Sequence, residues 1–134
     1  MASFVMDASA ILAMVHGEPG EDIVRRNLPG SIVSAVNVAE IGARLADHGI
    51  GETTIRDSIA ATGLEIVRFD AELAFASASL RAATRRQGLS LGDRACLALA
   101  QQRGMAVLTA DRAWSRLDLG ITVELIRRPS ARPT

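Results

Sequence analysis

Short apolar runs alternate with longer segments of helical periodicity along this chain. The apolar runs predict five strands, over residues 3–6, 31–34, 64–69, 105–108 and 121–126. Apolar positions three or four apart, or a closing glycine, predict helices over residues 8–15, 21–28, 36–48, 52–62, 71–87 and 90–103. Alternating strands and helices predict an α/β domain, in which a small parallel sheet of about five strands is covered by helices on both faces.

The length and the ends of the chain agree with one globular unit. We expect residues 1–134 to form a single domain with a loose tail from about residue 128, where two prolines follow. No apolar run approaches the roughly 20 residues that span a bilayer, and no basic segment precedes the first apolar run. We therefore expect a cytoplasmic protein without a membrane contact. Cys96 is the only cysteine, so a small buried thiol is expected there rather than a disulfide.

Four acidic residues stand at the junctions between predicted strands and helices. Asp7 and Asp111 follow the first and fourth strands, and Glu40 and Asp93 lie in the first turns of the third and sixth helices. The carboxyl ends of parallel strands lie along one edge of a sheet, and ligands bind in the crevice outside that edge. We therefore expect the four carboxylates to converge.

Each of these acids also has an ordinary structural interpretation. Asp7 and Asp111 could each cap the helical turn that follows, and Ser90 with Asp93 has the spacing of a capping box. However, Asp93 precedes Cys96 by three residues, which places it at the head of the apolar stripe of its helix. A carboxylate turned inward needs a cation or several hydrogen-bond donors, so a ligand role is favoured for Asp93.

Glu40 is less distinctive when taken singly. Asn37 and Glu40 have capping-box spacing, and Glu40 with Arg44 has the spacing of an ordinary i,i+4 surface pair. Its position alone leaves these alternatives open beside a ligand role. A capping or surface role for all four acids at one edge of a sheet would be a larger coincidence than a shared function.

A cluster of carboxylates points to a particular chemistry. Ligands that are all oxygen select a hard cation, Mg²⁺ or Mn²⁺, and the usual work of such a site is the hydrolysis of phosphodiesters. Arginines near two of the acids could hold phosphates: Arg94 beside Asp93, and Arg112 and Arg116 near Asp111. A solvated surface position is the competing interpretation of each arginine.

The composition excludes several other mechanisms. All 15 basic residues are arginine, and the absence of lysine excludes a P-loop and any Schiff-base enzyme. With two histidines and one cysteine, a structural zinc site is not expected. The formal net charge of zero argues against nucleic-acid binding by bulk attraction alone, so local charges must act if the substrate is a nucleic acid.

Four stretches of the chain together resemble PIN-domain ribonucleases of the VapC toxin type. They read Asp7-Ala-Ser-Ala-Ile-Leu, Ser34-Ala-Val-Asn-Val-Ala-Glu40, Gly88-Leu-Ser-Leu-Gly-Asp93-Arg-Ala-Cys and Leu108-Thr-Ala-Asp111-Arg-Ala-Trp. The resemblance extends from Phe4 to about Arg127. It implies a PIN-like fold and an endoribonuclease site dependent on Mg²⁺ or Mn²⁺. The metal-binding and catalytic acids would be Asp7, Glu40, Asp93 and Asp111, with Ser9 and Thr109 in supporting positions.

The same resemblance implies partners. They are an RNA substrate, a small VapB-like antitoxin encoded beside the toxin, and a second copy of the chain in a homodimer. The alternative is a PIN-like module that binds RNA or a protein without cutting. A phosphatase of the haloacid dehalogenase class is disfavoured, because that class needs Asp-x-Asp and a lysine, whereas the chain has Asp7-Ala-Ser9 and no lysine.

Overall fold

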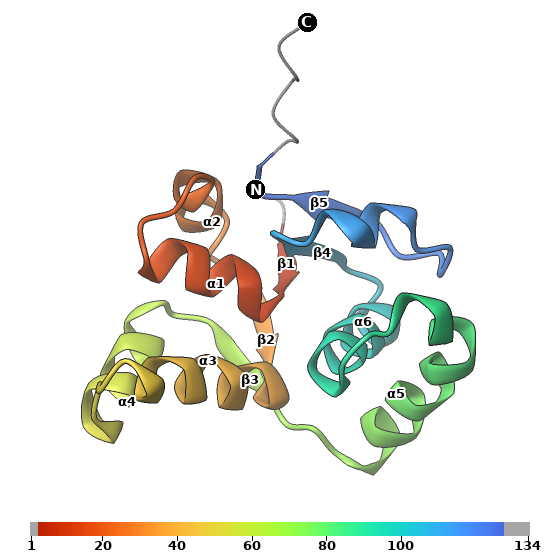
Figure 1. The fold of residues 1–134 in the computed structure, drawn as a ribbon, viewed down its shortest axis with the longest axis horizontal. Helices are drawn as coiled ribbons and strands as arrows, with labels where there is room; N and C mark the ends of the chain where they lie inside the picture. The colour runs from red at the N-terminus through yellow and green to blue at the C-terminus, as the bar shows by residue number, and fades with distance from the viewer. Residues whose placement is uncertain (1–2, 128–134) are drawn as a thin grey trace, which may run out of the picture.

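Five parallel strands form one sheet in the computed structural model, which describes residues 3–127 (Figure 1). Their order is β3-β2-β1-β4-β5, and every neighbouring pair is parallel, which confirms the predicted α/β class. The strands are β1 (Phe4–Met6), β2 (Ile32–Ser34), β3 (Glu65–Val67), β4 (Ala106–Thr109) and β5 (Val123–Leu125).

Helices cover both faces of this sheet, as predicted. They are α1 (Ala8–Val15), α2 (Glu21–Arg26), α3 (Ala35–Asp47), α4 (Glu52–Ala61), α5 (Ala71–Ala83) and α6 (Leu91–Arg103), with 3-10 turns η1 (Arg85–Gln87) and η2 (Arg112–Arg116). Figure 1 shows α1 to α4 on one side of the sheet and α5 with α6 on the other. Within the described part of the chain, no helix is long and apolar enough to cross a membrane.

The central strand β1 divides its side chains between two cores. Phe4 and Met6 pack with α1 and α3, whereas Val5 packs with α6 and Trp114 on the opposite face. This alternation follows from the two-residue period of a strand, and burial of both faces explains why the run is apolar throughout. Trp114 is only 1% exposed, so its side chain is part of this second core.

The chain reverses its direction of winding at β1, which has β2 on one side and β4 on the other. From β1 the chain adds β2 and β3 on one side, and later β4 and β5 on the other. The crevice at such a reversal is where doubly wound sheets bind ligands. The register pairs Met6 with Leu108, and the Asp7 amide donates to Leu108 O at 3.0 Å, so the ends of β1 and β4 are level.

Several predicted boundaries were wrong by two residues or more. The helix expected over residues 71–87 ends at Ala83, because Thr84 leaves the helical conformation (φ −118°, ψ 16°) and its hydroxyl donates to Leu80 O at 2.7 Å. The strands β3 and β5 are also shorter than the apolar runs at 64–69 and 121–126 that predicted them, and α2 ends two residues before its predicted end at residue 28. The tail expected to be loose from about residue 128 lies outside the described residues.

Candidate active site

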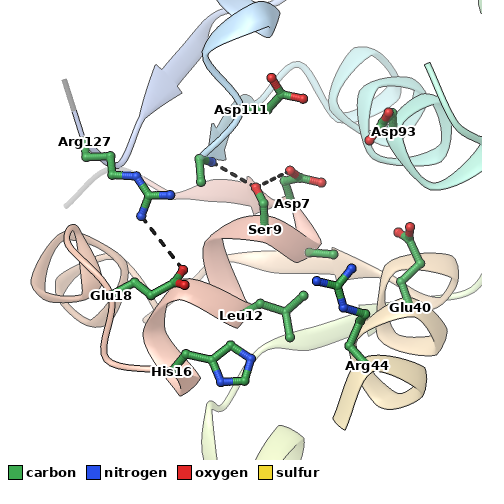
Figure 2. Close-up of a pocket in the computed structure, with 12 residues that line it drawn as sticks. Asp7, Ser9, Leu12, His16, Glu18, Glu40, Arg44, Asp93, Asp111 and Arg127 are labelled. Atoms are coloured by element: carbon green, nitrogen blue, oxygen red, sulfur yellow. Dashed lines mark hydrogen bonds and ion pairs between the residues drawn. The ribbon is translucent and has the colours of Figure 1, made fainter. Parts of the chain in front are cut away.

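The four acids predicted to converge all line one pocket of about 320 Å³ at the carboxyl ends of the strands (Figure 2). Asp7 follows β1, Asp111 follows β4, Glu40 lies on α3 and Asp93 lies in the first turn of α6. The other lining residues are Ala8, Ser9, Leu12, His16, Glu18, Arg44, Ala110 and Arg127. Segments more than a hundred residues apart therefore share this pocket.

Asp7 is the buried centre of the site, with 5% of its surface exposed. Its Oδ2 accepts hydrogen bonds from the hydroxyls of Ser9, at 2.5 Å, and Thr109, at 2.8 Å. Each hydroxyl in turn accepts a backbone amide from the loop after β4: Ala110 N donates to Ser9 and Asp111 N donates to Thr109. Each hydroxyl has one proton to donate, and in both residues that proton is donated to Asp7 Oδ2. These bonds therefore link the Asp7 carboxylate to the end of β4.

Burial raises the pKa of the Asp7 carboxyl from 3.8 to about 6, because the charged form loses its hydration. The hydrogen bonds from Ser9 and Thr109 oppose this rise, and the negative charges of Asp93 and Glu40 add to it. A cation close to Asp7 would lower this pKa and favour the ionised carboxylate.

Glu40 is held by contacts that neither of its ordinary interpretations predicts. Its Oε1 accepts a hydrogen bond from Asn37 Nδ2 at 2.8 Å, and the same Nδ2 donates to Gly92 O at 3.2 Å. The N-cap of α3 is Ser34 rather than Asn37, and no ion pair joins Glu40 to Arg44 within residues 3–127. The capping-box and surface-pair interpretations of Glu40 were therefore wrong.

Gly92 makes room for Glu40 at the start of α6. A β-carbon at position 92 would collide with the Glu40 carboxylate, so any other residue there would displace the end of the Glu40 side chain. Asn37 is fully buried between the two helices, where its amide joins Glu40 to the backbone of α6. The sequence prediction missed Asn37 and Gly92; a glycine within the first turn of a helix was the available signal.

Asp93 and Asp111 both act as caps. Asp93 Oδ2 accepts from Ser90 N at 2.9 Å and Asp93 N donates to Ser90 Oγ at 3.1 Å, which completes the predicted capping box. Asp111 Oδ1 accepts from Ala113 N at 3.0 Å and caps η2. Capping is therefore one role of each residue.

Cys96 lies one turn beyond Asp93 and is fully buried, as predicted. Burial raises the pKa of its thiol, and the negative charges of Asp7, Asp93 and Glu40 raise it further. A protonated, inaccessible thiol is unsuited to act as a nucleophile.

The four carboxylates share a pattern that suits a hard cation. Each accepts protein hydrogen bonds through one oxygen, and the second oxygen accepts none from residues 3–127. Across that range, no three acidic, histidine or cysteine side chains are grouped closely enough to hold an ion by themselves. Mg²⁺ keeps several waters and binds proteins through one or two carboxylates, so the donor set fits a hydrated Mg²⁺ or Mn²⁺.

The arginines predicted to bind phosphate lie outside the lining of this pocket. Arg94 is half-buried and donates to Ser77 O at 3.1 Å, which joins α6 to α5. Arg112 and Arg116 are exposed on η2. The basic residues that do line the pocket are Arg44, Arg127 and His16, none of which was predicted to bind phosphate.

Solved structures of toxin–antitoxin complexes have a similar fold at low sequence identity. A toxin–antitoxin complex from Klebsiella pneumoniae contains a chain with a TM-score of 0.70 and 18% identity, covering 96% of this chain and 100% of its own. DNA-bound VapBC from Salmonella typhimurium contains a chain with a TM-score of 0.67 and 20% identity, and the match covers 95% of this chain and 100% of that one. VapBC2 from Rickettsia felis, bound to a DNA fragment of its promoter, contains a chain with a TM-score of 0.70 and 14% identity. That match covers 92% of this chain and 98% of the other.

Curated proteins gave no match to this sequence. The family model described as the PIN domain matches residues 4–119, a span that runs from β1 past η2 and includes all four acids. The five-stranded parallel sheet and the pocket at its winding reversal agree with that match. The chain therefore belongs to the PIN domain family.

Proposed function

We propose that this protein is an endoribonuclease dependent on Mg²⁺ or Mn²⁺, and the toxin of a toxin–antitoxin pair. One observation carries the proposal: four carboxylates line a single pocket, and each keeps one oxygen free of protein hydrogen bonds within residues 3–127. PIN domains are typically nucleases and generally bind metal, which supports the same conclusion. As the substrate is RNA, we also propose that the protein acts in the cytoplasm.

In this proposal Asp7 and Asp93 hold the cation, assisted by Glu40 and Asp111. When bound, the cation supplies Lewis-acid activation of water and neutralises charge on the phosphate. The hydroxyls of Ser9 and Thr109 keep Asp7 Oδ2 occupied, which leaves Oδ1 as the oxygen for the ion.

The surroundings of these acids contribute to the same task. Asn37 holds Glu40 Oε1 and so leaves Oε2 available, either as a ligand or to accept a proton from the attacking water. Arg94, Arg112 and Arg116 remain proposed phosphate contacts; the exposed pair on η2 could meet RNA that extends beyond the pocket.

A small antitoxin of the VapB kind and a second copy of the chain are the proposed protein partners. Support comes from the solved structures of similar fold, which are toxin–antitoxin and VapBC complexes. Co-expression with the product of an adjacent short reading frame should suppress cleavage, and sedimentation of the purified chain should report a dimer. A monomer at micromolar concentration, with cleavage unaffected by the neighbouring product, would contradict both assignments.

The test of the enzyme is cleavage-site mapping on total RNA. Wild-type protein with Mn²⁺ should produce discrete cuts that a chelator abolishes, and Asp7→Asn should remove them while the fold is retained. Asp22→Asn is the matched control, because Asp22 is an exposed acid on α2 outside the pocket. Chelator-resistant cleavage that survives in Asp7→Asn would reject the proposal.

A non-cleaving module that binds RNA or a protein is the second candidate. It is favoured by the finding that no three potential ligands in residues 3–127 are grouped for chelation. A calorimetric titration with Mn²⁺ separates the two candidates. Binding in the micromolar to millimolar range that Asp7→Asn weakens supports the enzyme, and no detectable binding supports the module.

A further inference from the structure

Arg44 is a basic residue of the acid pocket whose guanidinium has no partner in the described chain. It lies on α3 one turn after Glu40 and lines the pocket. Figure 2 shows its guanidinium between Leu12 and Glu40, directed back towards the acids. Side chains of a helix lean towards its N-terminus, and this brings residue 44 over the site from the turn that follows.

The expected partner of Arg44 is occupied elsewhere. The i,i+4 spacing would let Glu40 pair with Arg44, but Glu40 is turned to Asn37 and to the start of α6. Among residues 3–127, Arg44 makes no ion pair within 4.0 Å, and its guanidinium donates no hydrogen bond. Its positive charge is therefore available to a ligand.

The other arginine of the pocket is already held. Arg127 donates to Pro19 O at 3.0 Å and lies 4.0 Å from the Glu18 carboxylate. These contacts fix it to the loop between α1 and α2, at the far end of the pocket from Glu40 in Figure 2. Within residues 3–127, Arg44 is the pocket arginine that keeps all its donors for an incoming group.

We infer that Arg44 binds a backbone phosphate of the RNA, next to the phosphate that is cleaved. A planar guanidinium can hold a phosphate through two parallel hydrogen bonds, which fixes the strand's register as well as adding attraction. The net charge of the chain is zero, so positioning has to come from individual cations of this kind. The inference rests on the proposed nuclease function for the identity of its ligand.

The test measures binding and its salt dependence separately from cleavage. A fluorescent single-stranded RNA of about 20 nucleotides is titrated with Asp7→Asn protein, which cannot cut it, over a series of salt concentrations. Adding Arg44→Gln should weaken binding about tenfold and lower the slope of log K against log salt by about 0.7, the value for one phosphate contact. Arg44→Lys should restore the slope but only part of the affinity.

Two controls separate a phosphate contact from structural damage. Arg26→Gln removes an exposed arginine of α2 outside the pocket and should change neither affinity nor slope. In the otherwise wild-type protein, Arg44→Gln should raise KM with little change in kcat, and should leave Mn²⁺ affinity equal or slightly higher, because a positive charge near the acids has gone. Weaker Mn²⁺ binding together with weaker RNA binding would overturn the inference.

The outcomes distinguish this inference from the proposed function. If the wild-type protein cuts RNA but Arg44→Gln changes neither the KM nor the salt slope, the phosphate site is rejected and the nuclease function stands. Protein that cuts no RNA, yet loses affinity and slope through Arg44→Gln, would reject the nuclease and retain the site.

Discussion

Replacing Asp7 by asparagine should stabilise the metal-free protein at neutral and basic pH. Burial raises the pKa of this carboxyl from 3.8 to about 6, so above pH 6 the folded protein must keep a charge where a neutral group is preferred. A rise of about 2 pKa units corresponds to about 3 kcal/mol between the two ionisation states. Asparagine removes the charge and keeps the shape.

The gain in the free energy of unfolding should be smaller than this upper limit, because the amide of the introduced asparagine is also polar and buried. The asparagine Oδ1 can accept the hydroxyls of Ser9 and Thr109, and its NH₂ group then faces the other acids of the pocket. We expect about 2 kcal/mol at pH 8, which for 134 residues corresponds to a rise in Tm of about 7 °C.

The sign of the pH dependence follows from linkage. The folded-state pKa is raised, so the native protein binds a proton more tightly than the unfolded chain, and this contribution to stability is complete below pH 3.8. It is lost as pH rises through about 6. The advantage of Asp7→Asn should therefore be nearly absent at about pH 4 and complete by about pH 8.

Thermal unfolding with a chelator at both pH values, at one protein concentration, tests this reasoning. Asp111→Asn is the matched control, because its carboxyl is exposed and asparagine preserves the cap of η2. Addition of Mn²⁺ should raise the Tm of wild-type protein and leave that of Asp7→Asn nearly unchanged. A variant that is less stable at pH 8, or equally stabilised at both pH values, would refute the argument.

Three further substitutions test the supports of the acids. Gly92→Ala should lower the free energy of unfolding by about 1–3 kcal/mol and weaken Mn²⁺ binding, because the new β-carbon displaces Glu40. In a Glu40→Ala background the same substitution should instead raise the free energy of unfolding by about 1 kcal/mol, since alanine favours a helix more than glycine does. Chemical denaturation of the wild type, the two single variants and the double variant measures the difference. Thr109→Val should lower the free energy of unfolding by about 1–3 kcal/mol in the same assay and raise the pKa of Asp7 further, because the hydroxyl is lost. Thr109→Ser keeps the hydroxyl and should restore both properties; equal losses in the two variants would contradict a role for the hydroxyl. Ser90→Ala should cost about 1 kcal/mol without changing the Mn²⁺ affinity measured by calorimetry, because only the cap is lost.

Most of the fold could be predicted because its strands are buried on both faces and its helices end at local signals. The run from Phe4 to Met6 is fully buried, and α1 has the predicted bounds, residues 8–15. The end of α5 could not be predicted in the same way. Alanine and arginine favour a helix through residue 86, but the chain leaves the helix at Thr84, whose hydroxyl donates to Leu80 O. Periodicity does not report such a choice.

The convergence of the acids could also be predicted, because parallel strands end at one edge. The support of Glu40 could not, since it involves Asn37 and Gly92, which are 55 residues apart and meet only when α3 packs on α6. The same packing turns Glu40 away from Arg44, so the most local prediction for both residues failed. The i,i+4 spacing fails to predict the partner when a buried amide competes for the same carboxylate. Leaving that amide without a hydrogen bond would cost more free energy than an exposed ion pair contributes.

The capping and ligand interpretations of Asp93 are compatible, because a carboxylate has two oxygens. The capping box uses Oδ2 alone, and a neutral asparagine or glutamine could accept the same Ser90 amide. The cap therefore accounts for the position of the side chain but not for its charge. Around this pocket the charges of Asp93 and Glu40 raise the pKa of Asp7, so negative charge collects there at a cost that helix capping does not require. A bound cation would offset that cost, so this excess of charge over structural need supports the proposed metal site.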